Sequence, residues 1–591
     1  MKSKWTLLGS LLALLLLALA VGLARAQGPA PSQPVGVQAA LGTAFTYQGQ
    51  LKKDGSPYSG NCDFRFSLWD AATGGTQIGS TQTKTGVSVS NGLFTIADLD
   101  FGSGAFTGDA RWLQIAVRCP AGSGSYTPLS PRQPLTPAPY ALALPGLWTQ
   151  QNATSPNLIG GYSGNSVTGG AVGATVGGGG ASGNVNRVTD NYGTVGGGSD
   201  NQAGDNVGAP DDCSFSTVGG GDGNTASGWA ATVGGGHNNN ASNRYATVGG
   251  GRDNTATGQE STICGGRGNQ ANSIQATVCG GWENAAYNAN ATVCGGQGNL
   301  AGYYATVGGG FYNRANGSYA TIGGGAQNTA SGAGAYVGGG GVDGTTVSGN
   351  QADGNASTIG GGTGNIASGS YATIGGGTGN IASGDSYATV SGGISNTASG
   401  ITATVGGGWG NIASGDTAAT VSGGVGNTAG GDFSTVPGGY NAAASHYGEM
   451  AYAGGRFANP GDAQTSLYVM RIEQTCSVGT WYDLYLNGNE GGSFGYLTIA
   501  PGRTVALDAL VVGRTQAGES AGYYIRGVVE NVGGTVSFIG APSVTVLGED
   551  DTAWNVRALA SDTYDALFIQ VQGNGETIRW VATVRTVEVS W

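Results

Sequence analysis

The sequence predicts an all-β fold, in which a β-solenoid is flanked by N- and C-terminal β-sandwich-like domains. Glycine accounts for 118 of the 591 residues, and most of it recurs at fixed positions. Residues 158–446 repeat a unit of about fifteen residues, and the segments on either side contain short alternating runs instead. A unit of this length with two short β runs and two turns is typical of one solenoid coil.

The composition excludes several classes of protein. The net charge is −12 and charged residues make up 10% of the chain, so no basic face for nucleic acid is expected. The hydrophobic share of 39% argues against a disordered tract. The glycine does not follow the G-X-Y period of collagen.

The first 26 residues have the pattern of a secretory signal peptide. Lys2 and Lys4 precede an apolar run from Leu7 to Leu23, and the sequence Ala-Arg-Ala ends at Ala26. We therefore expect a secreted protein at the cell surface, with an uncleaved N-terminal anchor as the alternative. Residues 27–42 are predicted to be a linker, and no later segment is apolar enough to cross a bilayer as a helix.

Residues 43–144 are predicted to form the N-terminal β domain. Its alternating runs include "CDFRFSLW", "GLFTIADL" and "RWLQIAV", separated by turn signals. Cys62 and Cys119 lie in this domain and are the natural disulfide pair, since export permits disulfides. The sequence does not settle the pairing of Cys213, Cys264, Cys279, Cys294 and Cys476. Residues 145–157 are read as a second linker.

The repeats align on the residue before Val or Ile in "T-[VI]-x-G-G", which we call the anchor. Longer steps before Thr194, Thr217 and Thr358 mark insertions. The seventeen anchors are residues 175, 194, 217, 232, 247, 262, 277, 292, 306, 321, 336, 358, 373, 389, 404, 420 and 435.

Several positions of the repeat hardly vary between copies. The third and fourth residues after the anchor are always glycine, the seventh is asparagine in fourteen copies, and the ninth is alanine in fifteen. Alternation along the strand places the small residue before the anchor and the Val after it inside a thin coil. The glycines permit positive φ or close approach at a corner, and the asparagine is expected to cap a left-handed turn.

Residues 447–591 contain longer alternating strands such as "TVALDALVVGR" and "IRWVATVRTVEVSW" and are predicted to be a β-sandwich or jelly roll. The stretches "AGGRFANPGDAQTSLYVMR" and "IRWVATVRTVEV" resemble a domain at the tips of phage tail fibres. The repeat pattern "ATVGGG-x-x-N-x-ASG-x-Y" over residues 158–446 is similar to the head repeats of trimeric autotransporter adhesins. That resemblance implies a left-handed parallel β-roll and a homotrimer.

The sequence contains few groups suited to catalysis. The chain has two histidines, and no lysine follows Lys84, which leaves little for His- or Lys-based chemistry. The match of "GGSFG" around Ser493 to a nucleophile elbow lacks the helix that such an elbow needs. The acidic residues form no convincing pair for glycoside hydrolysis. We therefore predict a protein that is not an enzyme and holds no metal or cofactor.

One repeat position varies freely beside the fixed glycines, namely the fifth residue after the anchor. Such a position belongs at an exposed turn tip, where aromatic side chains suit sugar or protein surfaces. The candidate binding residues are Trp282, Phe311, Trp409 and Tyr440. The simpler alternative is that residues at exposed turns vary without any role in binding. A threonine array on one face also suggests an ice-binding solenoid, or threonines buried between chains; its members are Thr232, Thr247, Thr262, Thr277 and Thr292.

The sequence as a whole predicts a secreted adhesion protein, in which a trimeric repeat rod presents binding surfaces to glycans, matrix or other cells. Its partners would be two further copies of the chain and a surface glycan or protein receptor. A phage tail-fibre-like receptor-binding protein and an ice-binding solenoid are the alternatives. A polysaccharide-acting enzyme would require a carboxylate pair in a groove.

Overall fold

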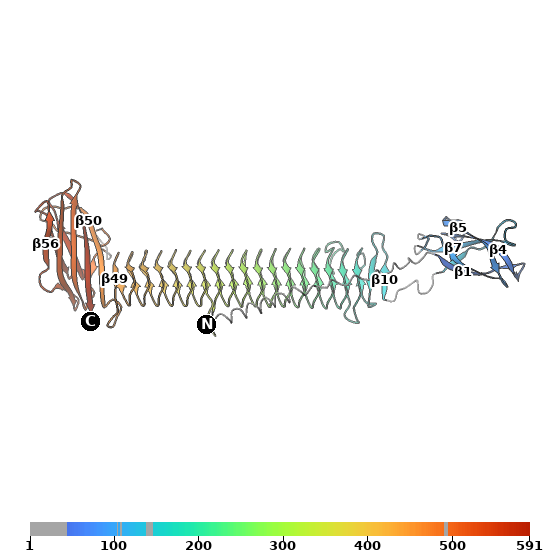
Figure 1. The fold of residues 1–591 in the computed structure, drawn as a ribbon, viewed down its shortest axis with the longest axis horizontal. Helices are drawn as coiled ribbons and strands as arrows, with labels where there is room; N and C mark the ends of the chain where they lie inside the picture. The colour runs from blue at the N-terminus through green and yellow to red at the C-terminus, as the bar shows by residue number, and fades with distance from the viewer. Residues whose placement is uncertain (1–43, 103–104, 107–108, 137–145, 345, 490–494) are drawn as a thin grey trace, which may run out of the picture. The chain divides into compact units, whose positions relative to one another are not determined.

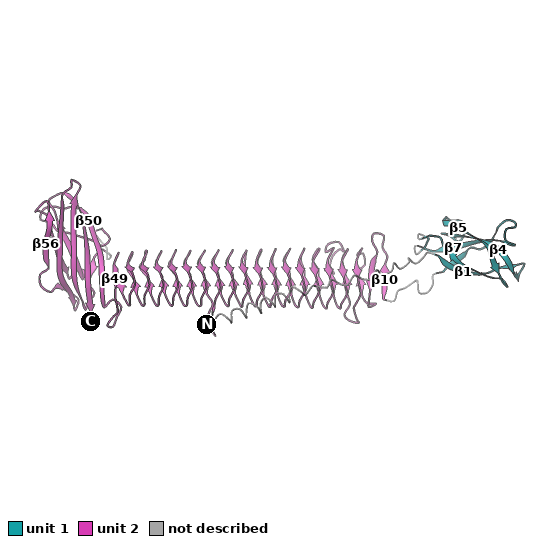
Figure 2. Cartoon of the chain, in the orientation of Figure 1, with its two compact units in different colours: residues 1–144 teal, residues 145–591 magenta. Residues whose placement is uncertain are grey.

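The computed structural model describes residues 44–102, 105–106, 109–136, 146–344, 346–489 and 495–591. The predicted signal peptide, the first linker and Ser493 lie outside these residues. The chain divides into two compact units, residues 1–144 and 145–591 (Figure 2). Every regular element in the described parts is a β-strand, and these parts contain no helix that could span a membrane.

The first unit contains two antiparallel sheets around one core, together with a short hairpin of β2 (Lys52–Lys53) and β3 (Ser56–Pro57). One sheet pairs β1 (Phe45–Gln50) with β6 (Leu93–Leu99). The other is built on β5 (Gln77–Val89), β4 (Gly60–Trp69) and β7 (Arg111–Arg118), extended by β8 (Thr127–Pro128) and β9 (Gln133–Leu135). The alternation of buried and exposed residues along β7 places Leu113, Ile115 and Val117 in the core.

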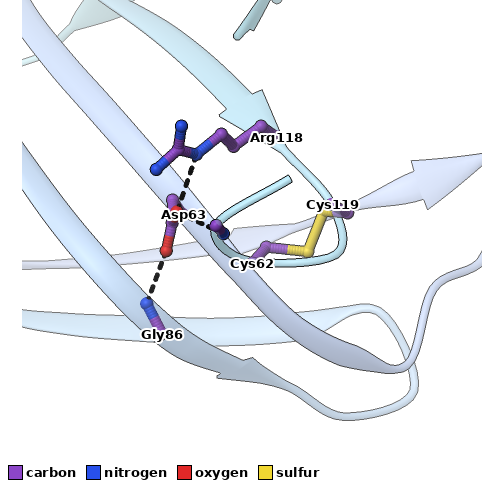
Figure 3. Close-up of a disulfide and its surroundings, with 6 residues drawn as sticks. Cys62, Asp63, Gly86, Arg118 and Cys119 are labelled. Carbon is purple, nitrogen blue, oxygen red and sulfur yellow. Dashed lines mark hydrogen bonds and ion pairs between the residues drawn. A yellow bond between two sulfur atoms is a disulfide. The ribbon is translucent and has the colours of Figure 1, made fainter. Parts of the chain in front are cut away.

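A disulfide joins Cys62 of β4 to Cys119 just after β7, which is the pair expected from the sequence. Asp63 lies beside it and is buried (Figure 3). Its carboxylate accepts hydrogen bonds from the backbone N–H groups of Gly86 at 2.7 Å and Gly122 at 2.9 Å, and forms an ion pair with Arg118. These partners hold the pKa of Asp63 below its usual value.

The second unit begins with the solenoid, which confirms the predicted fold class. One parallel sheet runs from β11 (Asn157–Gly160) to β49 (Met450–Tyr452) through the strands that start at the anchors, and β49 adds a coil beyond residue 446. A second parallel sheet of 18 two-residue strands runs from β12 (Ser166–Val167) to β48 (Ala443–Ala444). Each strand pairs in register with its equivalent one coil away, as Thr262↔Thr277 and Ile263↔Val278 do. The first sheet therefore has about 19 turns (Figure 1).

The interior of the solenoid is a single narrow column of small side chains. Val or Ile of the first sheet meets Ala of the second, and these residues are fully buried in nearly every coil. The anchor threonines point outward, as the alternation predicts.

The repeated asparagine does not cap a left-handed turn, contrary to the sequence-based expectation. It is buried in every coil from Asn165 to Asn427. In Asn284, Nδ2 donates to the carbonyls of Gly280 and Gly296, each at 2.9 Å, and Oδ1 accepts the N–H of Asn299 at 2.9 Å. Because each asparagine bonds its own corner and the next coil, the column supplies a partner to the first carbonyl, such as that of Gly280. It adds a second donor to the other carbonyl, because that of Gly296 also accepts the N–H of Trp282. The left-handed position is the residue just before it, such as Glu283 with φ 54°.

The insertions leave the coil intact. The insertion before Thr358 forms a small hairpin from β34 (Val342–Asp343) and β35 (Thr346–Val347), after which Asn350 rejoins the asparagine column. The insertion before Thr194 places Asn186 in the same column.

Antiparallel strands end the first solenoid sheet on both sides. β10 (Leu147–Gln150) covers β11 at one end. At the other end, β50 (Ala463–Thr475) pairs with β49 and starts the C-terminal domain. Unpaired sheet edges invite aggregation, so both ends of this sheet are protected.

The C-terminal domain is a sandwich of two antiparallel sheets, in line with the prediction. Its larger sheet contains the long strands β50, β59 (Thr577–Ser590), β53 (Arg503–Thr515) and β54 (Ser520–Val532), with β55 (Thr535–Phe538) and β56 (Ser543–Glu549) at the edge. The smaller sheet contains β51 (Tyr482–Asp483), β52 (Leu497–Thr498), β57 (Asn555–Ser561) and β58 (Ala566–Gln572). Trp554 and Trp580 are buried in its core.

Candidate functional site

The four aromatic residues proposed from the sequence lie on one turn edge of the solenoid and are exposed. Trp282, Phe311, Trp409 and Tyr440 are 43%, 40%, 61% and 46% accessible. Their positions pair from coil to coil through single bridges, but Gln297 stands between Trp282 and Phe311, and Val425 between the other two. These four rings are therefore isolated from one another.

The opposite turn edge carries a continuous aromatic surface that the sequence analysis missed. We call Tyr192, Phe215, Trp229 and Tyr245 the aromatic ridge. Consecutive ring centroids along it are 5.2, 5.8 and 4.9 Å apart. Tyr192, Phe215 and Tyr245 are 42–50% accessible, and Trp229 is half-buried. Four aromatic side chains from successive coils thus form one exposed strip.

The same edge bears shorter aromatic groups further along the rod. Tyr304 and Tyr319 stack at 5.0 Å, and Tyr371 and Tyr387 stack at 5.0 Å. These rings, too, are mostly exposed. The edge as a whole therefore offers repeated aromatic surface to the solvent.

The backbone conformation at this edge favours glycine, so the aromatic residues found there need another explanation. The residue two before the anchor has positive φ in all seventeen coils, for example 57° at Tyr245. Bulky side chains are uncommon in this conformation, and glycine would carry no steric cost. Yet eight of the seventeen residues are Tyr or Phe and only two are glycine. We infer that contact by the ring outweighs backbone preference here, and the bias towards Tyr and Phe at this position is the sequence signal that could have revealed the edge.

A cavity of about 590 Å³ lies beside the ridge, where the insertion before Thr217 folds over the coils. Asp205, Asp212, Cys213, Trp229 and Arg244 line it. The guanidinium of Arg244 lies 4.7 Å from the ring centroid of Trp229 and 5.1 Å from that of Tyr245. The cavity thus combines carboxylates, a guanidinium and an indole face, which suit the hydroxyl groups and apolar faces of sugars.

Burial raises the pKa of Cys213 in this cavity and of Asp190 in the neighbouring coil. Burial, followed by the carboxylate of Asp205, raises the pKa of the Cys213 thiol to about 12. Burial also raises the pKa of Asp190, which accepts a hydrogen bond from Thr189. Asp205, Asp212 and Cys213 bring three potential metal-ligand atoms within 4.8 Å of one another, but the protonated thiol is a poor ligand at neutral pH.

A second group of buried polar residues fastens the last coil to the C-terminal domain. Glu449, from the end of the solenoid, forms an ion pair with His446 at 3.0 Å. Glu588 of β59 forms an ion pair with Arg503, and the hydroxyl of Tyr468 contacts both carboxylates. Burial opposes the ionised form of Glu449, but the hydrogen bond and charge of His446, together with Ser466, lower its pKa overall. Since the carboxylates are already satisfied, we interpret this group as a structural joint.

The threonine array lies on the outer side of the first sheet. Sixteen of the seventeen anchors are threonine, with Tyr336 as the exception. The neighbouring outward position, two residues after the anchor, is glycine in eleven copies, and neither position is charged in any copy. These two positions are therefore uncharged along the rod.

Comparisons with known proteins match parts of this description. A family model described as a domain of unknown function (DUF8740) matches residues 46–132. No curated protein matches the chain. A solved structure that matches is the tailspike protein gp49 from Acinetobacter baumannii bacteriophage Fri1, a capsular polysaccharide depolymerase. The two chains are 10% identical, the match covers 72% of this chain and 80% of the tailspike, and the TM-score is 0.19.

This comparison contradicts the prediction that the protein is not an enzyme, because the matched tailspike is a depolymerase. The acidic residues are scattered along the sequence and show no convincing carboxylate pair there. In the folded chain, Asp190 and Asp205 lie in neighbouring coils. The backbone N–H of Asp205 donates a hydrogen bond to the carboxylate of Asp190 at 3.0 Å. At this TM-score the match assigns no role to any residue of this chain.

Proposed function

We propose that the chain is a fibrous receptor-binding protein that binds surface polysaccharide along the aromatic ridge. The observation that carries the proposal is the run of four neighbouring aromatic rings beside a charged cavity. Rings in successive coils let one extended ligand contact several of them, which multiplies weak individual contacts. A polysaccharide has the repeated apolar faces and hydroxyl groups that such a strip can recognise.

A tail-fibre-like role accounts best for the C-terminal domain. Of the two segments that resemble the tips of phage tail fibres, the first leads into β50 and ends within it, and the second lies in β59. These two strands pair directly along thirteen residues. The resemblance thus concerns one continuous part of the larger sheet. Cell adhesion, the first interpretation of the sequence, uses the same rod and is the second candidate. Export and a location at the cell surface are part of either proposal and rest on the signal-peptide pattern.

Replacing ridge residues tests the proposed function. Alanine already occupies the Tyr245 position in other coils, as at Ala230, Ala356 and Ala418, so Tyr245→Ala and Phe215→Ala should fold. We expect each to weaken binding on an array of bacterial capsular and cell-wall polysaccharides by about tenfold. Gln275→Ala, at the same turn position two coils on, should bind as the wild type does. Release of reducing ends, measured on the same samples, reports cleavage.

Two results would contradict this assignment. One is unchanged polysaccharide binding by the double variant of Phe215 and Tyr245. The other is a loss of binding in Gln275→Ala equal to that in Tyr245→Ala, because the effect would then not depend on the rings.

We also propose that three chains assemble through the threonine face. Coils spaced about 4.8 Å apart make the face roughly 80 Å long, and a width of roughly 10 Å gives about 800 Å² per chain, a common size for a stable interface. Sedimentation of the full chain should give three times the chain mass. A monomer would contradict the assembly and would leave the exposed threonines as an ice-binding candidate, to be tested by thermal hysteresis.

A further inference from the structure

Three cysteines occupy the same position in successive coils. Cys264, Cys279 and Cys294 each follow a core residue of the first sheet, and those core residues pair in register. The N–H of Cys264 donates to the carbonyl of Val278 at 3.0 Å, and the N–H of Cys279 to that of Val293 at 2.9 Å. All three thiols are exposed and none forms a disulfide. We call these residues the cysteine column. They lie on the threonine face, so in the proposed trimer the cations would be bound between chains.

The column is confined to one place on the rod. Its position, two residues after the anchor, is glycine in eleven copies, serine in two and proline in one. Exposed thiols add nothing to the core and are chemically reactive. Three of them in consecutive coils therefore point to a shared chemical role.

The spacing of the coils distinguishes two such roles. In-register parallel strands are about 4.8 Å apart, and side chains at equivalent positions keep that separation. A disulfide requires a Cβ–Cβ distance of roughly 3.5–4.5 Å. With a bond length of roughly 2.3 Å, as in zinc–thiolate sites, two metal–sulfur bonds span about 4.6 Å. A metal ion fits between neighbouring sulfurs at this separation, whereas a disulfide, which the Cα spacing also allows, requires the Cβ atoms to move closer together.

We propose that the cysteine column binds a soft, thiophilic cation of the Cu(I) class, with each ion bridging two successive thiolates and Cys279 shared between the pairs. Thiolate ligands select such ions over hard cations. Each cysteine releases its proton to the solvent as the metal–sulfur bond forms.

The surroundings of Cys279 oppose the loss of its proton, so a bound cation must displace that proton. Burial raises the pKa of its thiol, and so do the neighbouring sulfurs of Cys294 and Cys264. A cation between the sulfurs would turn this mutual repulsion into attraction. Binding should consequently weaken as the pH falls, because protons compete for the sulfurs.

The test uses the reduced full-length chain and Ag(I), a soft cation that does not change oxidation state under these conditions. The metal retained after dialysis is measured per chain by elemental analysis, and Cu(I) is added anaerobically in parallel. Cys279→Ser removes both pairs and should lower Ag(I) retention at least tenfold. Cys264→Ser leaves the pair of Cys279 and Cys294 and should still retain Ag(I). Serine already occupies this position at Ser391 and Ser422, so both variants should fold.

Cys213→Ser serves as the background control, because Cys213 lies outside the column, and it should retain Ag(I) as the wild type does. Equal retention by the wild type and Cys279→Ser would overturn the proposal. So would a cystine between Cys264 and Cys279, or between two chains, in protein purified without reductant, because the thiols would then be consumed by oxidation.

Discussion

Arg503→Met is expected to destabilise the C-terminal domain by about 3–5 kcal/mol, because it leaves the buried carboxylate of Glu588 without a cation. The side chain of Glu588 is 3% accessible. It retains hydrogen bonds from Thr586 and Gln464, but neither donor carries a charge. Differential scanning calorimetry of the full chain should show the transition of this domain at a clearly lower temperature.

Arg579→Met provides the matched control. Arg579 forms an ion pair with Glu473 in the same sheet, but their side chains are 77% and 57% accessible. Exposed pairs of this kind contribute little to stability, so the transition should not move. Adding Glu588→Gln to Arg503→Met should restore part of the lost stability, because the buried group is then neutral. If Arg503→Met and Arg579→Met behaved alike, the buried pair would not be stabilising the joint.

Asn284→Ala should open the solenoid locally. The substitution removes three buried hydrogen bonds and leaves the carbonyl of Gly280 and the N–H of Asn299 without a partner. The carbonyl of Gly296 keeps the backbone N–H of Trp282. Unpaired buried polar groups cost about 1–3 kcal/mol each, and relaxation of the neighbouring coils should reduce the total to roughly 3 kcal/mol. Native-state hydrogen exchange at Asn299 should then be about 100-fold faster.

The control for this experiment is Glu283→Ala, at the exposed residue immediately before the asparagine. It should leave exchange at Asn299 unchanged. Because each coil contacts only its neighbours, amides several coils away should keep their protection in both variants. Equal exchange rates in Asn284→Ala and the wild type would mean that the asparagine column does not hold the coils together.

The sequence predicted the coil well because its signals are local. In the stretch "TIC" at residues 262–264, the alternation predicted that the side chain of Thr262 points out of the coil and that of Ile263 points into it. The paired glycines predicted the corner that follows. The asparagine was assigned the wrong role because its partners, such as Gly296 for Asn284, lie in the next coil. Nothing in the local pattern tells a turn cap from a ladder that runs along the rod.

The candidate sites were harder to predict for the same reason. The aromatic ridge depends on Trp229 and Phe215 lying in adjacent coils, and on a left-handed backbone that favours glycine. The joint depends on Glu449 and Glu588, which are far apart in the sequence and meet only after the C-terminal domain has folded. Residue types at short spacing reveal coil geometry, but contacts between distant segments require the folded chain.

The three insertions show how such a rod can change its specificity. Each leaves the sheet of anchor strands and the asparagine column continuous, and the hairpin of β34 and β35 is one example. The insertion before Thr217 adds Asp212 and Cys213 to the cavity beside the ridge. A segment added at a coil corner can therefore create a new recognition surface without a new core, so related rods can diverge in what they bind while their framework stays the same.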